Sequence, residues 1–108
     1  MITVNLIKDS NENISGFSLE GHSGYADAGM DIVCAAVSTL AINTVNSIEK
    51  LTSDADNIVL GEDTEPGNLK VVFKRPVSKE TRLLIDSMFL GLSDIQKNYG
   101  DQFVKVFY

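Results

Sequence analysis

The amino-acid sequence predicts an α+β fold in which two helices pack on one face of a mostly antiparallel sheet, in the order ββαββαβ. Short runs of alternating apolar and polar residues indicate strands, and two longer runs with apolar residues at helical spacing indicate helices. Polar clusters that contain Gly, Asn or Pro separate these runs. With 108 residues, 44% of them hydrophobic, the chain is expected to form a single domain, residues 1–108, around one core.

The first two strands are expected to form a hairpin. Ile2 and Val4 alternate with polar neighbours at the start of the chain, and Phe17 and Leu19 do so after the polar turn at 9–13. A polar loop joins the next two strands as a second hairpin. These and the last strand are expected at 57–60, 69–73 and 103–107.

Two helices are expected between the strands. The first spans about 31–51, with Asp31 as its N-cap. The second follows Ser78, a good N-cap, and ends before Gly100, which suits the C′ position. At the start of the first helix, residues 32–37 leave almost no polar face, so this end of the helix is expected to be largely buried.

Composition limits the cellular setting and the partners. No apolar run approaches the roughly 18–20 residues that span a bilayer, and the N-terminus lacks the pattern of a signal peptide. A lone cysteine forms no intramolecular disulfide, so a cytoplasmic protein without membrane contact is expected. The net charge of −6 and the scattered basic residues argue against direct nucleic-acid binding and favour a basic protein as partner. The charge also has the simpler interpretation that it keeps the protein soluble.

Cys34 is the candidate nucleophile. If Asp31 is the N-cap, Cys34 is the third residue of the helix, where unpaired amides and the positive end of the helix dipole favour a thiolate. The same amides could stabilise a tetrahedral oxyanion during acyl transfer. The alternative is that Cys34 fills the core between Val33 and Val37, and spacing alone does not separate the two interpretations.

His22 is the candidate base, because it is the only histidine and its ordinary pKa lies near neutrality. It ends the second strand and opens the small-residue loop 23–30, whose other end is the start of the Cys34 helix. The hairpin and the helix can therefore bring the two side chains together. Asp31 and Asp27 are candidates to orient His22, although helix capping is the stronger role for Asp31. The alternative is an ordinary exposed histidine at a strand end.

Ser38 lies one turn after Cys34 on the same helix face. Its hydroxyl is expected either to hydrogen-bond the thiolate or a substrate carbonyl, or to donate back to the carbonyl of Cys34. One cysteine and one histidine are too few for a structural zinc site, and the loop lacks the Lys-Ser/Thr ending of a phosphate-binding loop. No metal and no cofactor are therefore expected.

Residues 20–38, which read EGHSGYADAGMDIVCAAVS, resemble the bacterial ribosomal-processing cysteine protease family. That family shows a Gly-His pair, a loop of small residues, then Gly-x-Asp-Ile-Val-Cys-Ala and a serine one turn further on. Length and the order of elements are also similar across the whole chain. The resemblance implies a homodimeric endopeptidase with a mobile lid loop. Such an enzyme removes a short N-terminal extension from ribosomal large-subunit protein twenty-seven, a step needed for ribosome assembly.

By position, the resemblance assigns Cys34 as the nucleophile and His22 as the base of a Cys–His dyad. Gly21 would let the chain turn close to the substrate. Asp31 would cap the helix, and Ser38 would be an accessory site residue. Two other functions stay open: a non-catalytic ribosome-assembly module that binds a ribosomal protein without cutting it, and a thiol-dependent transferase or redox enzyme. For the last, the sequence holds no cofactor motif and no resolving cysteine.

Overall fold

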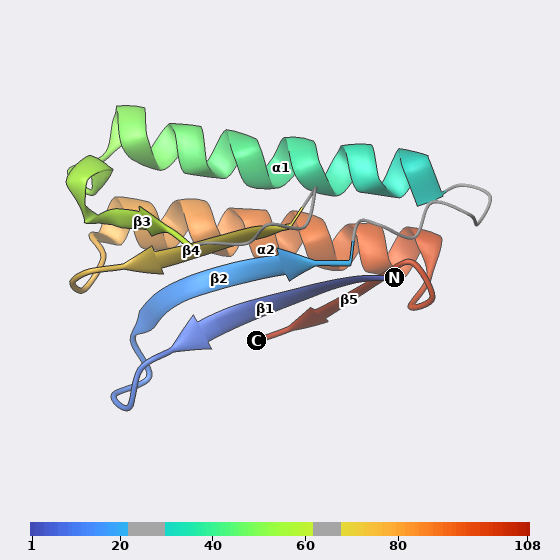
Figure 1. Cartoon of the computed structure of the whole chain (residues 1–108), viewed down its shortest axis with the longest axis horizontal. Coiled ribbons are helices and arrows are strands. Elements are labelled where there is room, and N and C mark those ends of the chain that lie inside the picture. The colour runs from blue at the N-terminus through green and yellow to red at the C-terminus, as the bar shows by residue number, and fades with distance from the viewer. Residues whose placement is uncertain (22–29, 62–67) are drawn as a thin grey trace.

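The computed structural model describes residues 1–21, 30–61 and 68–108, with Met30 described by its backbone alone. Within these ranges lie two α-helices and five strands, in the order that the sequence predicts (Figure 1). The α+β fold class is confirmed. The strand segments expected from alternation and the helix segments expected from periodicity differ from the observed ones by only a few residues at their ends.

The strands form one mixed sheet with the spatial order β3-β4-β2-β1-β5. Their bounds are β1 (Ile2–Lys8), β2 (Ile14–Glu20), β3 (Ile58–Leu60), β4 (Leu69–Phe73) and β5 (Val104–Phe107). The β1–β2 and β3–β4 pairs are antiparallel, as expected for hairpins, and β2 is antiparallel to β4. The last strand, β5, runs parallel to β1, with Val104 opposite Ile2. The sheet is thus mostly antiparallel, with one parallel edge.

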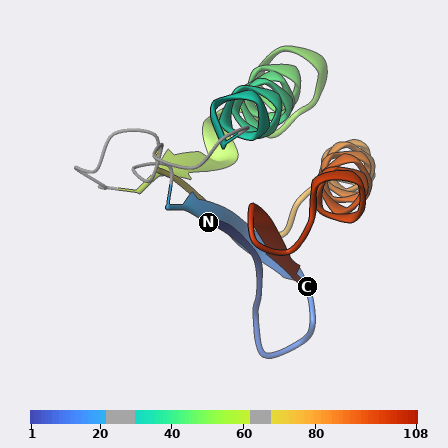
Figure 2. The same ribbon diagram turned by 90° about the vertical axis from the view of Figure 1, so that its right-hand side faces the viewer.

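Both long helices, α1 (Met30–Leu51) and α2 (Lys79–Tyr99), cover the same face of the sheet (Figure 2). The ends of α2 follow the expected capping chemistry. The Ser78 side chain accepts a hydrogen bond from the backbone N–H of Thr81 at 3.2 Å. Gly100, with φ 110, donates its N–H to the carbonyl of Gln96 at 2.8 Å.

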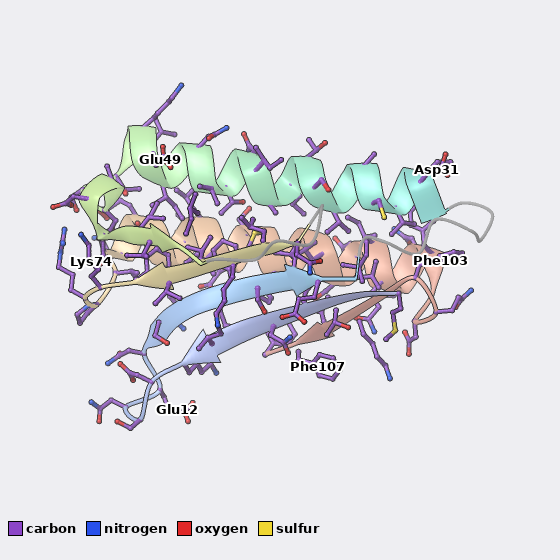
Figure 3. The ribbon with its side chains drawn as sticks, in the orientation of Figure 1. Glu12, Asp31, Glu49, Lys74, Phe103 and Phe107 are labelled. Atoms are coloured by element: carbon purple, nitrogen blue, oxygen red, sulfur yellow. The ribbon has the colours of Figure 1, made fainter. Side chains whose placement is uncertain are left out.

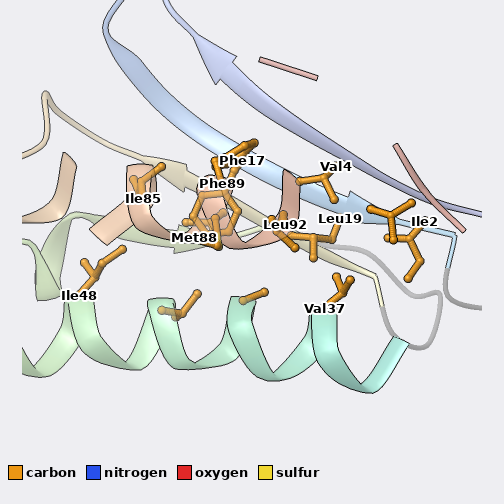
Figure 4. Packing of buried hydrophobic residues seen from close by; sticks show 14 of the residues in the cluster. Ile2, Val4, Phe17, Leu19, Val37, Ile48, Ile85, Met88, Phe89 and Leu92 are labelled. Carbon is orange, nitrogen blue, oxygen red and sulfur yellow. The ribbon is translucent and has the colours of Figure 1, made fainter. Parts of the chain in front are cut away.

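The hydrophobic core lies between the sheet and the two helices. Figure 4 shows Val4 of β1 and Leu19 of β2 pointing toward the helix layer, where Val37 of α1 and Leu92 of α2 lie. Full burial of a side chain of this size contributes about 1.5–3 kcal/mol. The largest fully buried side chains are Phe17, Ile2, Leu19, Ile48, Ile85, Met88, Leu92, Val4, Val33, Val37 and Val71.

The start of α1 is less buried than expected. Val33 and Val37 are fully buried, but Ile32 is 58% exposed and Ala35 also lies on the surface. The prediction of a largely buried helix end is therefore wrong on one side. A straight helix presents a single stripe to a sheet, so apolar residues outside that stripe face away from the core.

Helix α1 also corrects the expectation about membrane spans. By length and composition alone, Asp31–Leu51 is long and apolar enough to cross a bilayer. The core helix of a soluble protein passes the same test, and 39% of the most apolar window of α1 is buried inside the protein. Packing of Val33, Val37 and Ile48 against the sheet accounts for much of this apolar character.

A buried polar cluster joins the end of α1 to the start of α2. The Asp54 carboxylate accepts hydrogen bonds from Thr81 Oγ1 at 2.5 Å, Ser78 N–H at 2.9 Å and Asn57 Nδ2 at 3.1 Å. Asn57 Oδ1 in turn accepts from the backbone N–H of Arg75 at 2.8 Å. Burial raises the pKa of the Asp54 carboxyl, but these hydrogen bonds outweigh burial and lower the pKa to about 2.

Asn57 was expected to begin a strand, and it instead ends a short 3₁₀ helix, Ala55–Asn57. The first residue of β3 is Ile58. The buried Asn57 side chain bonds to Asp54 and to the backbone of Arg75, and these contacts hold its backbone in the turn. Side-chain hydrogen bonding of this kind competes with strand pairing.

Candidate active site

The candidate residues belong to segments that meet at one end of the molecule. There β1 starts, β2 ends and α1 begins (Figure 1). Thr3 pairs with Glu20, which places the start of the chain beside the end of β2. Figure 3 shows Asp31 at this end of α1 and Glu49 at the opposite end. Gly21 and Cys34 therefore belong to the same end of the fold.

Cys34 is the fifth residue of α1, because the helix begins at Met30. The sequence predicted the third position, with Asp31 as the N-cap, but Asp31 lies inside the first turn and is exposed. The unpaired amides of a helix belong to its first four residues, so the Cys34 amide is not among them. Since Cα–Cβ bonds tilt toward the helix N-terminus, the Cys34 side chain still leans toward the first turn.

Cys34 is 6% exposed and belongs to the hydrophobic cluster. Burial raises the pKa of the thiol above its ordinary value; the positive amino terminus opposes this and the negative charge of Asp31 adds to it. The expectation that helix position alone lowers this pKa is therefore wrong. The dipole effect falls off within the first turn, whereas the cost of desolvating a thiolate acts directly on the sulfur. A neighbouring base must remove the proton if Cys34 is to act as a nucleophile.

Ser38 lies half-buried one turn beyond Cys34 on α1. In the described part of the chain, its hydroxyl makes neither the hydrogen bond to Cys34 Sγ nor the back-bond to the Cys34 carbonyl that the sequence suggested. Back-bonding does occur further along the helix, where Thr44 Oγ1 donates to the Leu40 carbonyl at 2.8 Å. Ser38 is thus placed one turn beyond Cys34 on α1, and its accessory role stays a prediction.

The predicted base, His22, lies outside the described residues, as do Asp27 and the predicted lid apart from the Met30 backbone. Its role stays a prediction from the sequence. The two residues that flank this segment, Gly21 and Met30, are described in their backbone.

Gly21 occupies a backbone conformation that requires glycine. Its φ is +99°, and a Cβ atom at this position would overlap the carbonyl oxygen of Met1. The family resemblance implies that Gly21 lets the chain turn close to the substrate. In the structure, the close approach is to the chain's own first residue, which fixes the direction in which the chain leaves β2.

Asn68 is a candidate that the sequence did not reveal. Its side-chain Oδ1 accepts a hydrogen bond from the backbone N–H of Gly21 at 3.0 Å, across 47 positions of sequence. Asn68 directly precedes β4 and is half-buried. Nothing in the local sequence pairs these two residues, because their contact depends on how β4 docks against β2.

Among residues 1–21, 30–61 and 68–108, no group of three or more His, Cys, Asp and Glu side chains could hold a metal ion. A groove of about 590 Å³ does lie between α1 and α2. Within the described chain, neither Cys34 nor Ser38 lines it, so the groove opens elsewhere than at the thiol. Its lining is mainly apolar and includes Ala36, Leu40 and Ile95.

Comparisons with known proteins agree over nearly the whole chain. Residues 1–104 match the family described as cysteine protease Prp. The ribosomal processing cysteine protease Prp of Bacillus subtilis is 30% identical over 105 residues, covering 94% of this chain and 92% of the relative.

Two solved structures of an essential ribosomal processing protease Prp from S. aureus share this fold over 100% of both chains. One is in complex with a substrate peptide, with a TM-score of 0.86 and 24% identity. The other holds a covalently linked product peptide, with a TM-score of 0.82 and 25% identity.

Proposed function

The chain belongs to the cysteine protease Prp family, and we propose that it is an endopeptidase that removes a short N-terminal extension from a ribosomal large-subunit protein. The resemblance in sequence implies that large-subunit protein twenty-seven is the substrate. The relatives are ribosomal processing proteases, and one of them is known with a covalently linked product peptide. The reaction is hydrolysis of one peptide bond during ribosome assembly.

The observation that carries this proposal is that Cys34 is the only cysteine in the chain. A cysteine protease requires a thiolate nucleophile, and this sequence supplies one thiol. The thiol lies in the second turn of α1 at the end of the fold where β2 also ends. Ser38, half-buried one turn further on, is an accessory residue that can hydrogen-bond a substrate carbonyl.

His22 is the proposed base, and it is the only histidine in the chain. It takes the proton from Cys34 Sγ, and the thiolate then attacks the scissile carbonyl carbon. When the tetrahedral intermediate collapses, the C–N bond breaks and the imidazolium returns the proton to the leaving amine. Water then hydrolyses the thioester, which releases the N-terminal extension and regenerates the thiol.

The raised pKa of Cys34 makes such a base necessary, since a buried thiol without a partner is protonated at neutral pH. Once formed, the imidazolium would stabilise the thiolate by charge. Asp31, exposed in the first turn, carries the opposite sign and does not favour the thiolate. Its proposed role is therefore to stabilise the start of α1, because a negative charge interacts favourably with the positive end of the helix dipole.

The charge of the chain agrees with a ribosomal protein as substrate. A net charge of −6 attracts a basic protein and disfavours direct binding to nucleic acid. At cellular salt this attraction acts over a Debye length of about 8 Å, so it assists encounter rather than specificity. We place the enzyme in the cytoplasm, where its single free thiol stays reduced.

The proposal is tested by incubating the protein with extended large-subunit protein twenty-seven and weighing the products by mass spectrometry. We expect a single cut that releases the N-terminal extension. A substrate that co-purifies uncut would instead indicate the alternative function, a non-catalytic assembly module. An oxidised or derivatised substrate of unchanged chain length would indicate a redox enzyme or a transferase.

Alkylation of Cys34 by iodoacetamide should depend on His22. In His22→Ala, we expect the alkylation rate at pH 7 to fall at least about tenfold and to rise with pH beyond the ordinary thiol pKa of about 8.5. In the wild-type protein the rate should level off at lower pH, because the base stabilises the thiolate. Mass spectrometry of quenched samples measures both profiles, and Cys34→Ala shows the background. Identical profiles for wild type and His22→Ala would exclude His22 as the base.

We further propose that the enzyme is a homodimer, as the family resemblance implies. Apolar side chains on the outer faces of both helices support this, since Ile32 and Ile42 of α1 and Leu83 and Leu90 of α2 are each more than half exposed. Sedimentation equilibrium is expected to give twice the chain mass of 11.8 kDa. The single-chain mass at micromolar concentration would contradict the dimer.

A further inference from the structure

We propose that Asn68 is a positioning residue for catalysis, which acts on His22 through the backbone of Gly21; this inference rests on the proposed role of His22 as the base. Asn68 directly precedes β4 and Gly21 directly follows β2, so the contact closes the end of the strand pair nearest to the candidate site. Neither residue needs to touch the substrate for this role.

The hydrogen bond between Asn68 and Gly21 lies just beyond the last residue pair of the β2–β4 ladder. The last pair between β2 and β4 is Leu19 with Leu69. Beyond it, the Asn68 side chain supplies the acceptor, with Oδ1 lying 3.0 Å from the Gly21 nitrogen. An N–H···O distance of this size is that of an ordinary backbone hydrogen bond. The half-buried Asn68 side chain thus continues the hydrogen bonding between the two strands beyond their last backbone pair.

Gly21 needs such an anchor because glycine by itself is the most permissive residue in the backbone. Its φ of +99° lies in a region that other residues rarely adopt, and the Met1 carbonyl restricts it from the side of β1. Asn68 restricts it from the side of β4. The two contacts together select one conformation from the many that glycine can take.

His22 is bonded covalently to Gly21, so the orientation of Gly21 sets the point and direction from which the His22 backbone starts. Only one peptide bond, with about 3.8 Å between the two Cα atoms, separates Gly21 from His22. A rotation of the Gly21 backbone therefore changes the direction in which the chain continues to His22. Misplacement of a catalytic group by about 1 Å can cost 10²-fold in rate. The anchor matters for the chemical step more than for substrate affinity, because it holds a reacting group rather than a binding surface.

The test compares Asn68→Ala with Asn68→Asp in a peptide-cleavage assay that uses the cleavage junction of large-subunit protein twenty-seven. Asn68→Ala removes the acceptor, and we expect kcat to fall about 10- to 100-fold with KM within about twofold. Asn68→Asp keeps an acceptor oxygen, and kcat should recover to within about threefold of wild type.

Hydrogen exchange at the Gly21 amide checks the contact without reference to activity. We expect faster exchange in Asn68→Ala and near-normal exchange in Asn68→Asp. Asn46→Ala, a change of the same size on the exposed surface of α1, is the matched control and should alter neither readout. Thermal unfolding of each variant shows that it is folded at the assay temperature.

The outcomes are distinguishable. If wild type cleaves and Asn68→Ala retains kcat within twofold, the inference is wrong and the proposed function stands. Equal losses of kcat in Asn68→Ala and Asn68→Asp would assign the side chain a purely structural role and also overturn the inference. If the wild type does not cleave, or if His22→Ala cleaves as wild type does, the proposed function fails in that respect and the inference fails with it.

Discussion

Replacing Cys34 by alanine is expected to abolish peptide cleavage while the protein remains folded. The nucleophile of a covalent protease has no substitute, and its loss in comparable enzymes costs about 10⁴-fold or more in kcat. Alanine removes only the sulfur from a site that is 6% exposed. The resulting cavity is small, so we expect a loss of about 1 kcal/mol in the free energy of unfolding.

The matched control is Val45→Ala on the same helix. Val45 is 8% exposed and belongs to the same hydrophobic cluster, three turns beyond Cys34. Its truncation removes two methyl groups and should cost about 2 kcal/mol in stability, more than Cys34→Ala, with cleavage retained below the melting temperature. Cleavage by Cys34→Ala within tenfold of wild type would disprove the covalent mechanism. A comparable loss of cleavage in Val45→Ala would show that the assay responds to stability.

The position of Cys34 was predictable, and its pKa was not. A polar residue before an apolar periodic run locates a helix start to within a residue or two, and Asp31 did so here. The direction of the pKa shift depends on how deeply the sheet and the helix enclose the sulfur. That enclosure involves strands distant in sequence, so local spacing could not predict it.

The same distinction separates the features of the fold that were foreseen from those that were not. The cap residues Ser78 and Gly100 act on their own helix, and both were predicted. The parallel pairing of β5 with β1 was left open, because a short alternating strand carries no mark of its neighbour. The contact of Asn68 with Gly21 was missed for a related reason, since it forms only after β4 has docked on β2.

Asp54→Asn is expected to be the most destabilising of the isosteric substitutions in the buried polar cluster. The carboxylate accepts hydrogen bonds from Thr81, Ser78 and Asn57, and it is 3% exposed. An amide in its place turns one acceptor oxygen into a donor that faces other donors. We expect a loss of about 2–3 kcal/mol in the free energy of unfolding at neutral pH, measured by urea denaturation. Cleavage should persist where the variant is folded, because the cluster lies at the opposite end of α1 from Cys34.

The destabilisation should also depend on pH in a defined direction. The pKa of Asp54 is lowered from 3.8 to about 2 in the folded protein, so the folded state holds this proton less tightly than the unfolded state. The stabilisation is therefore fully present above the unfolded pKa of about 3.9 and is lost as pH falls through about 2. We expect the difference in unfolding free energy between wild type and Asp54→Asn to shrink by about 2 kcal/mol between pH 5 and pH 1.

Asp56→Asn is the control that separates this cluster from surface charge. Asp56 is exposed and bonds to Arg75 Nη2 at 2.7 Å, an interaction that salt screens. We expect a smaller destabilisation that fades with added salt, whereas the effect of Asp54→Asn should change little with salt, because its partners are buried hydroxyl, amide and backbone groups. A difference between wild type and Asp54→Asn that is independent of pH would show that shape, rather than the carboxylate charge, holds the end of α1 to the start of α2.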